Sequence, residues 1–215
     1  ASWFLPFNQG WNSGAGNPPN PDGLKTDYLW KQVLTRESLA NIIESYAQVV
    51  EEEEAEASGK KRKKRKQIFP RFHQLRTVRA LLRRAHTDGV GKRYLIQHSA
   101  GSGKSNTIAW LAHQLVELRR KDDPMTAQFD SIIVITDRRA LDTQIARTIK
   151  GYDHVASIFG HSDNAQKLRE YLRRGKKIIV TTVQKFPFIL DELGDLSGKS
   201  FALLIDEAHS SQGGK

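Results

Sequence analysis

The strongest constraint on the fold is a glycine-rich turn that links a short apolar run, residues 94–97, to a stretch of helical periodicity beginning near Lys104. Gly101 and Gly103 can adopt positive φ, which lets successive backbone N–H groups point toward one anion. The positive end of the following helix strengthens that attraction. The pattern is typical of a phosphate-binding loop. The residues expected to contact a nucleotide are Ala100, Gly101, Ser102, Gly103, Lys104 and Ser105.

Two side chains of this loop have specific expected roles. Lys104 would reach the β and γ phosphates of ATP, and the Ser105 hydroxyl would coordinate Mg²⁺. The general template has a glycine where this chain has His98. The loop alone therefore leaves an ordinary Gly-Ser turn at a helix start as an alternative.

The pattern after residue 93 predicts an α/β fold. Short apolar runs alternate with amphipathic helical segments, and the runs are 94–97, 131–136, 155–159, 178–182 and 201–205. This alternation predicts a parallel, doubly wound sheet with helices on both faces. In such sheets ligands collect at the carboxyl ends of the strands.

Two adjacent acids, Asp206 and Glu207, directly follow the last apolar run. In a nucleoside triphosphatase the first acid would hold Mg²⁺, and the second would orient the water that attacks the γ phosphate or accept its proton. The alternative is that both acids merely cap a following helix. The phosphate-loop pattern upstream favours the catalytic interpretation.

The chain carries a formal charge of +10 and contains no cysteine. Residues 60–66 are all basic, and residues 51–54 and 56 are acidic; outside these blocks 27 basic and 19 acidic residues leave +8. A basic body favours a polyanionic partner, although a merely soluble basic surface is the alternative. We expect no membrane span or signal peptide, because the sequence has no long apolar run and no basic start followed by an apolar core.

Four segments are predicted. Residues 1–34 form an irregular arm rich in Trp, Pro and Gly, and residues 35–57 form a helix with Thr35 as N-cap. Residues 58–67 form a mobile basic loop, either solvated or facing DNA, with a nuclear-localisation signal as a weaker alternative. Residues 68–215 form the α/β lobe.

The lobe resembles the first RecA-like lobe of superfamily 2 helicases and translocases. The resemblance is carried by Gly-Lys-Ser at 103–105, by Asp206-Glu207-Ala208-His209, and by 133–138 and 179–186, which are similar to motifs Ia and Ib. It implies a catalytic group of Lys104, Asp206, Glu207 and His209. It also implies that Arg138, Thr182 and Lys185 contact a nucleic-acid backbone, where an ordinary polar helix start is the alternative.

Arg71-Phe72-His73-Gln74 resembles the adenine-reading Q motif of the same enzymes. A glutamine amide both donates and accepts, which suits the N6/N7 edge of adenine. Arg71 and Gln74 are thus expected near the base, with Phe69 or Phe72 stacking on it. The alternative is that Gln74 is an exposed helix residue.

A narrower resemblance is to the R subunit of type I restriction-modification enzymes. The residues that carry it are 3–10, 14–19, 25–30, 98–105 and 206–212, and that family has a histidine at the position of His98. Ser210 departs from the family, which commonly has Arg there. The resemblance implies a prokaryotic cytoplasmic motor on double-stranded DNA, with methyltransferase and specificity subunits as partners.

The same resemblance implies that this chain is a fragment. The family's nuclease domain and second motor lobe have no counterpart here, so we expect weak nucleotide binding and slow turnover. Two other functions stay open: another superfamily 2 motor, for instance an RNA helicase, and a scaffold that binds nucleic acid without nucleotide. The retention of Lys104, Ser105, Asp206 and Glu207 argues against the scaffold.

Overall fold

The computed structural model describes residues 7–55, 61–99, 101–136, 145–146, 148–149, 159–185 and 196–207. The chain forms two compact units, Ala1–Thr77 and Val78–Lys215. The division falls within helix α2 (Phe72–Asp88), ten residues after the predicted start of the lobe at residue 68. Each unit is described by itself. None of the described helices is long and apolar enough to cross a membrane.

The arm at the start of the first unit is irregular but ordered. The Asn8 side chain donates to the Ala15 carbonyl oxygen (2.6 Å), and the Gln9 N–H donates to Oδ1 of Asn17 (2.9 Å). The Tyr28 hydroxyl donates to the Phe7 carbonyl oxygen. Side-chain amides thus replace the regular backbone bonds that a segment rich in Pro and Gly cannot make.

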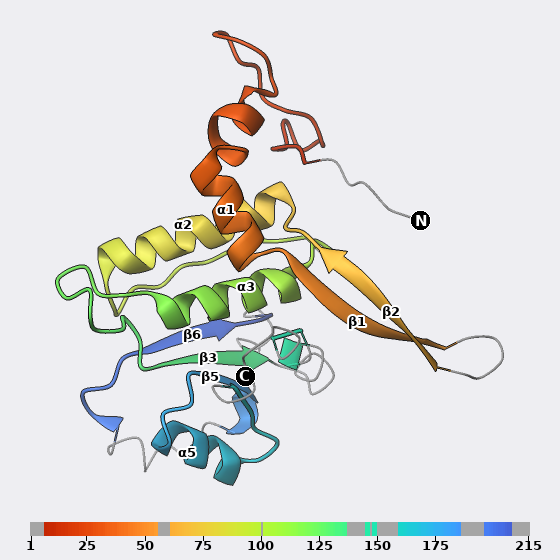
Figure 1. The fold of residues 1–215 in the computed structure, drawn as a ribbon. Coiled ribbons are helices and arrows are strands. Elements are labelled where there is room, and N and C mark those ends of the chain that lie inside the picture. The colour runs from red at the N-terminus through yellow and green to blue at the C-terminus, as the bar shows by residue number, and fades with distance from the viewer. Residues whose placement is uncertain are drawn as a thin grey trace, which may run out of the picture. The chain divides into compact units, whose positions relative to one another are not determined.

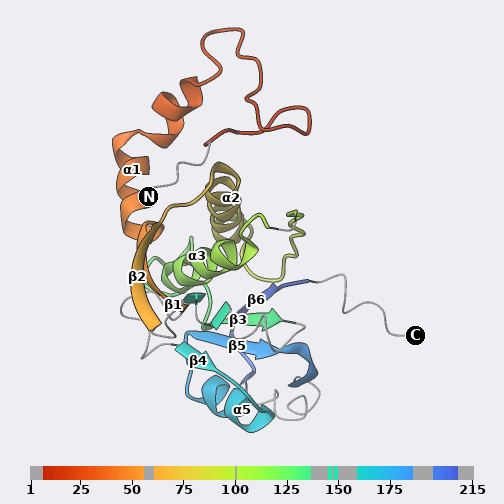
Figure 2. The ribbon, with the colours of Figure 1, turned by 90° about the vertical axis from the view of Figure 1, so that its right-hand side faces the viewer.

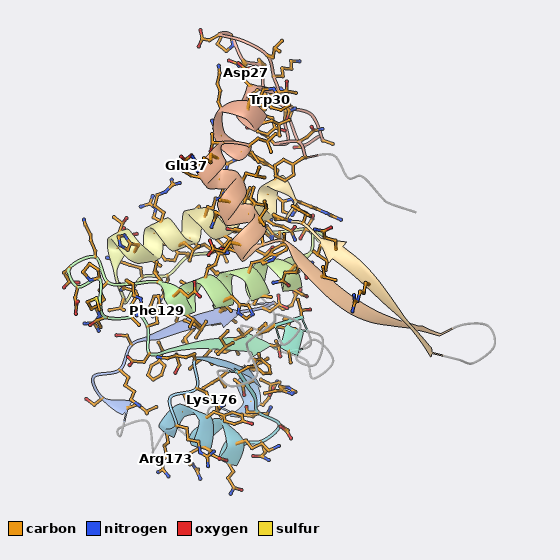
Figure 3. The ribbon with its side chains drawn as sticks, in the orientation of Figure 1. Asp27, Trp30, Glu37, Phe129, Arg173 and Lys176 are labelled. Carbon is orange, nitrogen blue, oxygen red and sulfur yellow. The ribbon has the colours of Figure 1, made fainter. Side chains whose placement is uncertain are left out.

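Three aromatic rings hold this arm to the start of α2. The Phe72 ring lies edge-on to both Phe7 (centroids 5.6 Å apart) and Tyr28 (5.2 Å). Trp30, labelled in Figure 3, follows on the one-turn π-helix η1 (Leu29–Val33) and is exposed. The aromatic residues of the arm therefore divide into a packed set and an exposed set.

Helix α1 (Arg36–Ser45) begins as predicted, because Oγ1 of Thr35 accepts a bond from the Ser38 N–H (3.4 Å). The predicted helix over 35–57 is wrong for residues 46–55. Residues Gln48–Ala55 form strand β1, which pairs antiparallel with β2 (Lys61–Ile68) as a twisted ribbon (Figure 1). The mobile basic loop over 58–67 is likewise wrong for 61–67.

The physical reason is a long-range one. A run of four glutamates has no opposite charge within its own helix turns, whereas the antiparallel register places a basic residue opposite each of them. Local periodicity cannot report a partner that lies 8 to 14 residues further along the chain. Residues 56–60 lie outside the described part of the chain.

The second unit contains a four-stranded parallel sheet in the order β4-β5-β3-β6 (Figure 2). The strands are β3 (Ser131–Thr136), β4 (Phe159–His161), β5 (Ile178–Thr182) and β6 (Phe201–Ile205). The predicted strands 131–136, 178–182 and 201–205 are confirmed residue for residue. Of the predicted run 155–159, only its last residue is described, and it begins β4.

Helices cover both faces of this sheet. Leu168 and Leu172 of α5 (Ala165–Arg173) pack with Ile133, Ile135 and Ile179 on one face. Helix α3 (Lys104–Glu117) lies on the opposite face in both views (Figures 1 and 2) and buries Trp110 and Leu111. The predicted parallel, doubly wound α/β fold is confirmed.

The predicted strand over 94–97 is wrong. Residues 92–99 form neither helix nor strand, and Leu95 is 89% exposed. Apolar composition predicts a strand, but a strand also needs a neighbouring backbone to bond. Within the described ranges β6 bonds only to β3, and no segment pairs with its other edge.

Candidate nucleotide-binding site

The phosphate-loop residues fold as a tight turn into α3. Gly101 and Gly103 have φ of 73° and 84°, in the left-handed region that favours glycine. A Cβ at Gly101 would meet nothing within 4 Å, so the requirement there is conformational rather than steric. The Ser102 N–H donates to the Ser99 carbonyl oxygen (3.3 Å), and Gly103 is the N-cap of α3. This turn sets Lys104 and Ser105 in the first turn of the helix.

The helix start is closed by the backbone of Gly103. Its carbonyl oxygen accepts from the N–H groups of Asn106 (3.1 Å) and Thr107 (3.2 Å). The first N–H groups of a helix have no carbonyl of their own helix to bond, and they lie at its positive end. The loop therefore presents a field that attracts an anion, as the sequence predicts.

The acids that follow β6 lie beside this loop. Nζ of Lys104 is 2.8 Å from Oε1 of Glu207, although 103 residues separate them in the sequence. The Asp206 N–H donates to the Ile135 carbonyl oxygen (2.9 Å), which continues the β3–β6 pairing by one residue. Glu207 then adopts a φ of 53°, and its N–H donates to Oδ1 of Asp206 (3.1 Å). Parallel pairing thus places both acids at the carboxyl end of the sheet.

The electrostatics of the three groups differ. Burial raises the pKa of Asp206, which is 9% exposed, and the negative charge of Glu207 raises it further. The hydrogen bond to Glu207 raises the pKa of Lys104, so that the ammonium stays charged. Glu207 and Lys104 neutralise each other. The surroundings of the buried Asp206 carboxylate, by contrast, destabilise its charged form.

This arrangement fits Mg²⁺ held together with a nucleotide. A cation beside Asp206 would favour its charged form and so offset the effect of burial. Among the described residues no group of three or more His, Cys, Asp or Glu side chains could hold a metal. Magnesium usually binds one or two protein oxygens plus substrate phosphates, which is what Asp206 and Ser105 offer.

Two of the predicted nucleic-acid contacts, Thr182 and Lys185, lie at or just beyond the end of β5. Thr182 is buried at the end of β5, and Lys185 donates to the Ser162 carbonyl oxygen beyond β4. The Ser162 hydroxyl donates to Oγ1 of Thr181 (2.9 Å). Sequence reasoning missed Ser162, because no motif includes it; its only signal is its place just after a short strand. The contacts of Thr182 and Lys185 with nucleic acid stay predictions.

Gln74 is 3% exposed, so the alternative of an exposed helix residue is wrong. Its Oε1 accepts from the Arg71 N–H (2.8 Å), which caps the first turn of α2 in the manner of a capping box. The Phe72 ring packs on Phe7 and Tyr28, whereas Phe69 is exposed. Contact of Arg71 and Gln74 with adenine stays a prediction.

Three predicted site residues lie outside the described part of the chain: Ala100, Arg138 and His209. The structure brings together Lys104, Asp206 and Glu207 at the start of α3, with Ser105 in the same helical turn as Lys104. The catalytic role of each residue stays a prediction at this point.

The curated proteins similar to this chain include two that are named as type I restriction enzyme endonuclease subunits. One, from Mycoplasma pneumoniae, is named as the C-terminal part of a putative type I restriction enzyme MpnIIP endonuclease subunit and is 32% identical over 56% of this chain and 57% of its own length. The other, from Methanocaldococcus jannaschii, is named as a putative type I restriction enzyme MjaVIIIP endonuclease subunit and is 24% identical over 93% of this chain and 21% of its own length. The chain thus spans about half of one relative and a fifth of the other.

The predicted resemblance to type I restriction enzyme subunits is confirmed by these similarities. The model of the SWI2/SNF2 ATPase family matches residues 73–215, which include the phosphate loop and both acids after β6. This match covers well over half of the chain. The chain belongs to the SWI2/SNF2 ATPase family.

Proposed function

We propose that this chain is the ATP-binding first lobe of the motor in a type I restriction endonuclease subunit. The motor would couple ATP hydrolysis to movement along double-stranded DNA before cleavage. The observation that carries the proposal is the contact of Lys104 with Glu207, which joins the phosphate loop to the acids after β6. Family membership and the names of the two relatives support the same assignment.

In this proposal the loop from Ala100 to Gly103 binds phosphate oxygens through its backbone N–H groups, and Lys104 neutralises the β and γ phosphates. Asp206 and Ser105 hold Mg²⁺, which when bound spreads the charge that develops on the γ phosphate. Lys104 cannot face the phosphates and Glu207 equally, so nucleotide binding exchanges one anionic partner for another. Glu207 is then free to orient water and accept its proton.

His209 completes the motif of the two acids and is proposed as a further catalytic residue. Arg71 and Gln74 are proposed to contact adenine, which requires Gln74 to leave its cap on α2. Arg138, Thr182 and Lys185 are proposed to touch the DNA backbone; for Lys185 this means releasing the Ser162 carbonyl oxygen. We therefore expect ligand binding to replace these two local contacts, of Gln74 and of Lys185, and to leave the fold unchanged.

The proposed setting is the cytoplasm of a prokaryote, in a complex with methyltransferase and specificity subunits. A second lobe that supplies an arginine would raise turnover by about three to five decades. An RNA-directed motor of superfamily 2 is the competing function. It would show stronger stimulation of ATP hydrolysis by RNA than by duplex DNA.

The test is Lys104→Ala in the full-length protein that contains this chain, with DNA-stimulated ATP hydrolysis as the readout. Removing the lysine should lower the rate at least a hundredfold, because an ammonium aimed at developing phosphate charge is worth about 3 kcal/mol or more. Lys121→Ala, an exposed lysine after α3, is the matched control and should leave the rate unchanged. Retention of ATP hydrolysis in Lys104→Ala would refute the assignment of the loop.

Binding can be tested on the present chain. Millimolar Mg²⁺-ATP should raise the melting temperature modestly, since a ligand that binds only the folded state stabilises it. Glu207→Gln should keep this shift, whereas Lys104→Ala should lose it. The absence of any shift in the wild-type chain would mean that binding requires further parts of the protein.

A further inference from the structure

The β1–β2 ribbon pairs an acidic strand with a basic strand in register. Four consecutive positions match acid to base: Glu51 with Arg65, Glu52 with Lys64, Glu53 with Lys63, and Glu54 with Arg62. Lys66 and Lys61 flank them, opposite Val50 and Ala55. The basic strand thus has six consecutive cations, of which four are matched and two are not.

Little else in the ribbon's composition favours a strand. A two-stranded sheet by itself is marginally stable in water, and Glu and Lys are depleted in strands. Val49, at the base of the ribbon, is mostly exposed. The register of opposite charges therefore supports the pairing, since directly opposite unlike charges favour it and like charges oppose it.

The spacing of β2 also suits a phosphate backbone. A strand advances about 3.3 Å per residue, and one DNA strand carries a phosphate about every 3.4 Å along the helix axis. Because successive strand residues lie on opposite faces, every second cation falls on one face, at the spacing of about two nucleotides. Strand β1 offers a matching row of carboxylates from within the same chain.

We propose that β1 is a built-in polyanion that occupies the basic strand β2, and that the phosphate backbone of double-stranded DNA displaces it. In the paired ribbon the excess charge over these strands is two positive charges, too little to hold DNA. In the opened ribbon all six cations become available. The proposal uses the proposed function only to choose DNA as the polyanion.

The magnitudes allow this exchange at low salt. Each register pair opposes opening by a factor of about 1.4 to 5. Each phosphate contact changes DNA affinity by about eightfold for a tenfold change in salt concentration. The phosphate contacts are the more salt-dependent, so the exchange is favoured in dilute salt and opposed as salt rises.

The first test neutralises the acidic strand. In the full-length protein, Glu51→Gln, Glu52→Gln, Glu53→Gln and Glu54→Gln together should bind a labelled 30-base-pair duplex at least tenfold more tightly in anisotropy titrations. The plot of log affinity against log salt should steepen by about 3.6 units, about 0.9 for each of the four newly available contacts. If the acidic strand does not compete with DNA for the basic strand, neither the affinity nor the salt slope will change in this way.

A matched control separates unmasking from added positive charge. Glu37, Glu44, Glu117 and Asp122 are exposed acids outside the ribbon. Their joint change to Gln or Asn alters the net charge by the same amount and should raise affinity only about twofold, with an unchanged salt slope. Equal behaviour of the two fourfold variants would overturn the proposal.

The second test locks the ribbon without touching the acids. The chain has no cysteine, so Ala55→Cys with Lys61→Cys, which are register partners, can form a single disulfide. The oxidised protein should bind the duplex at least tenfold more weakly than the same protein after reduction. Equal affinity in both states would also overturn the proposal.

Failure of this proposal can be told apart from failure of the proposed function. Lys104→Ala removes nucleotide binding if the loop assignment is right, and it should leave both ribbon effects on DNA binding intact. If Lys104→Ala loses ATP hydrolysis and the ribbon variants show no change in DNA affinity, only the ribbon proposal is refuted. Ribbon effects with intact ATP hydrolysis in Lys104→Ala would sink only the loop assignment.

Discussion

Strands β3 and β2 follow opposite rules although both bond to a neighbour along their full length. All six residues of β3 are buried, and it has a parallel neighbour on each side. Strand β2 contains six consecutive Lys and Arg residues and has one antiparallel neighbour, which contributes four glutamates. Two different interactions thus favour strand formation: burial of apolar side chains in β3, and pairing of unlike charges in register in β2.

The two ways respond differently to solution conditions. Apolar burial is insensitive to salt, because it depends on area removed from water. Charge register is screened by salt within a Debye length of about 8 Å at physiological ionic strength. Four changes test whether apolar burial stabilises the sheet and charge register stabilises the ribbon.

The largest effect is expected from Ile179→Ala in β5. This side chain is fully buried in the cluster with Ile133 and Leu168, so truncation should lower the free energy of unfolding by about 2–5 kcal/mol. Urea denaturation at 0.05 M and 1 M NaCl should give the same loss. Ile43→Ala on α1, where the side chain is mostly exposed, is the control and should cost less than about 0.5 kcal/mol.

The second prediction looks for a charge effect inside the sheet unit. His113 on α3 is largely buried, with Nε2 3.2 Å from the Ile149 carbonyl oxygen, and burial lowers the pKa of its ring to about 4. Since the unfolded value is 6.5, the unfolded chain binds more protons between these values. The stability due to neutral His113 is complete above pH 6.5 and falls by about 3 kcal/mol as the pH drops to 4.

Urea denaturation of the wild type and His113→Gln between pH 7.5 and pH 4.5 measures this loss. Gln can still donate to the Ile149 carbonyl oxygen but does not titrate. The variant should therefore lose less stability than the wild type over this range. Parallel curves for the two proteins would show that His113 is not the group responsible.

The third prediction concerns close packing at the end of the sheet. A Cβ on Gly160 of β4 would lie 2.7 Å from Cδ2 of Tyr171, so Gly160→Ala should cost about 1–3 kcal/mol. The combination of Gly160→Ala with Tyr171→Leu should cost less than the sum of the two single changes, because the clash is removed. Additive costs in thermal melts would contradict the packing explanation. Gly16→Ala, where a Cβ would meet nothing, is the control.

The smallest effect is expected in the ribbon. Raising NaCl from 0.05 M to 1 M should lower the local opening free energy of β1 and β2 by about 1 kcal/mol, seen as a few-fold faster amide exchange. Amides of β3 and β5 in the same sample should keep their rates. Ribbon amides that exchange equally fast at both salt concentrations would remove the distinction between the two kinds of strand.

Sequence patterns located the sheet strands well where burial decides the structure. Strands β3, β5 and β6 match their predicted bounds because continuous apolar runs with turn signals at both ends leave few alternatives. The N-cap at Thr35 was also predictable, because its cause is local. The failures, at residues 46–55, 61–67 and 94–97, involve backbone partners that local periodicity cannot identify.

The candidate site shows the same limit. The glycine pattern of the loop and the pair Asp206 and Glu207 were recognisable because each is a contiguous motif with its own chemistry. The sequence did not predict that the Gln74 side chain is buried and caps α2, since a buried amide takes a donor that lies near it in the fold. The part played by Ser162 was not predictable, because it depends on strands 19 residues apart being neighbours.

The sequence by itself determined the apolar strands, the helix caps and the types of chemical group that can bind phosphate and Mg²⁺, because these depend on local pattern and composition. The tertiary structure decided which of those groups meet. Parallel pairing of β3 with β6 brings Glu207 to within 2.8 Å of Lys104, and antiparallel register sets the acidic residues of β1 against the basic residues of β2. Both results follow from strand pairing, in which the backbone bonds of one segment are satisfied by another that is distant in sequence.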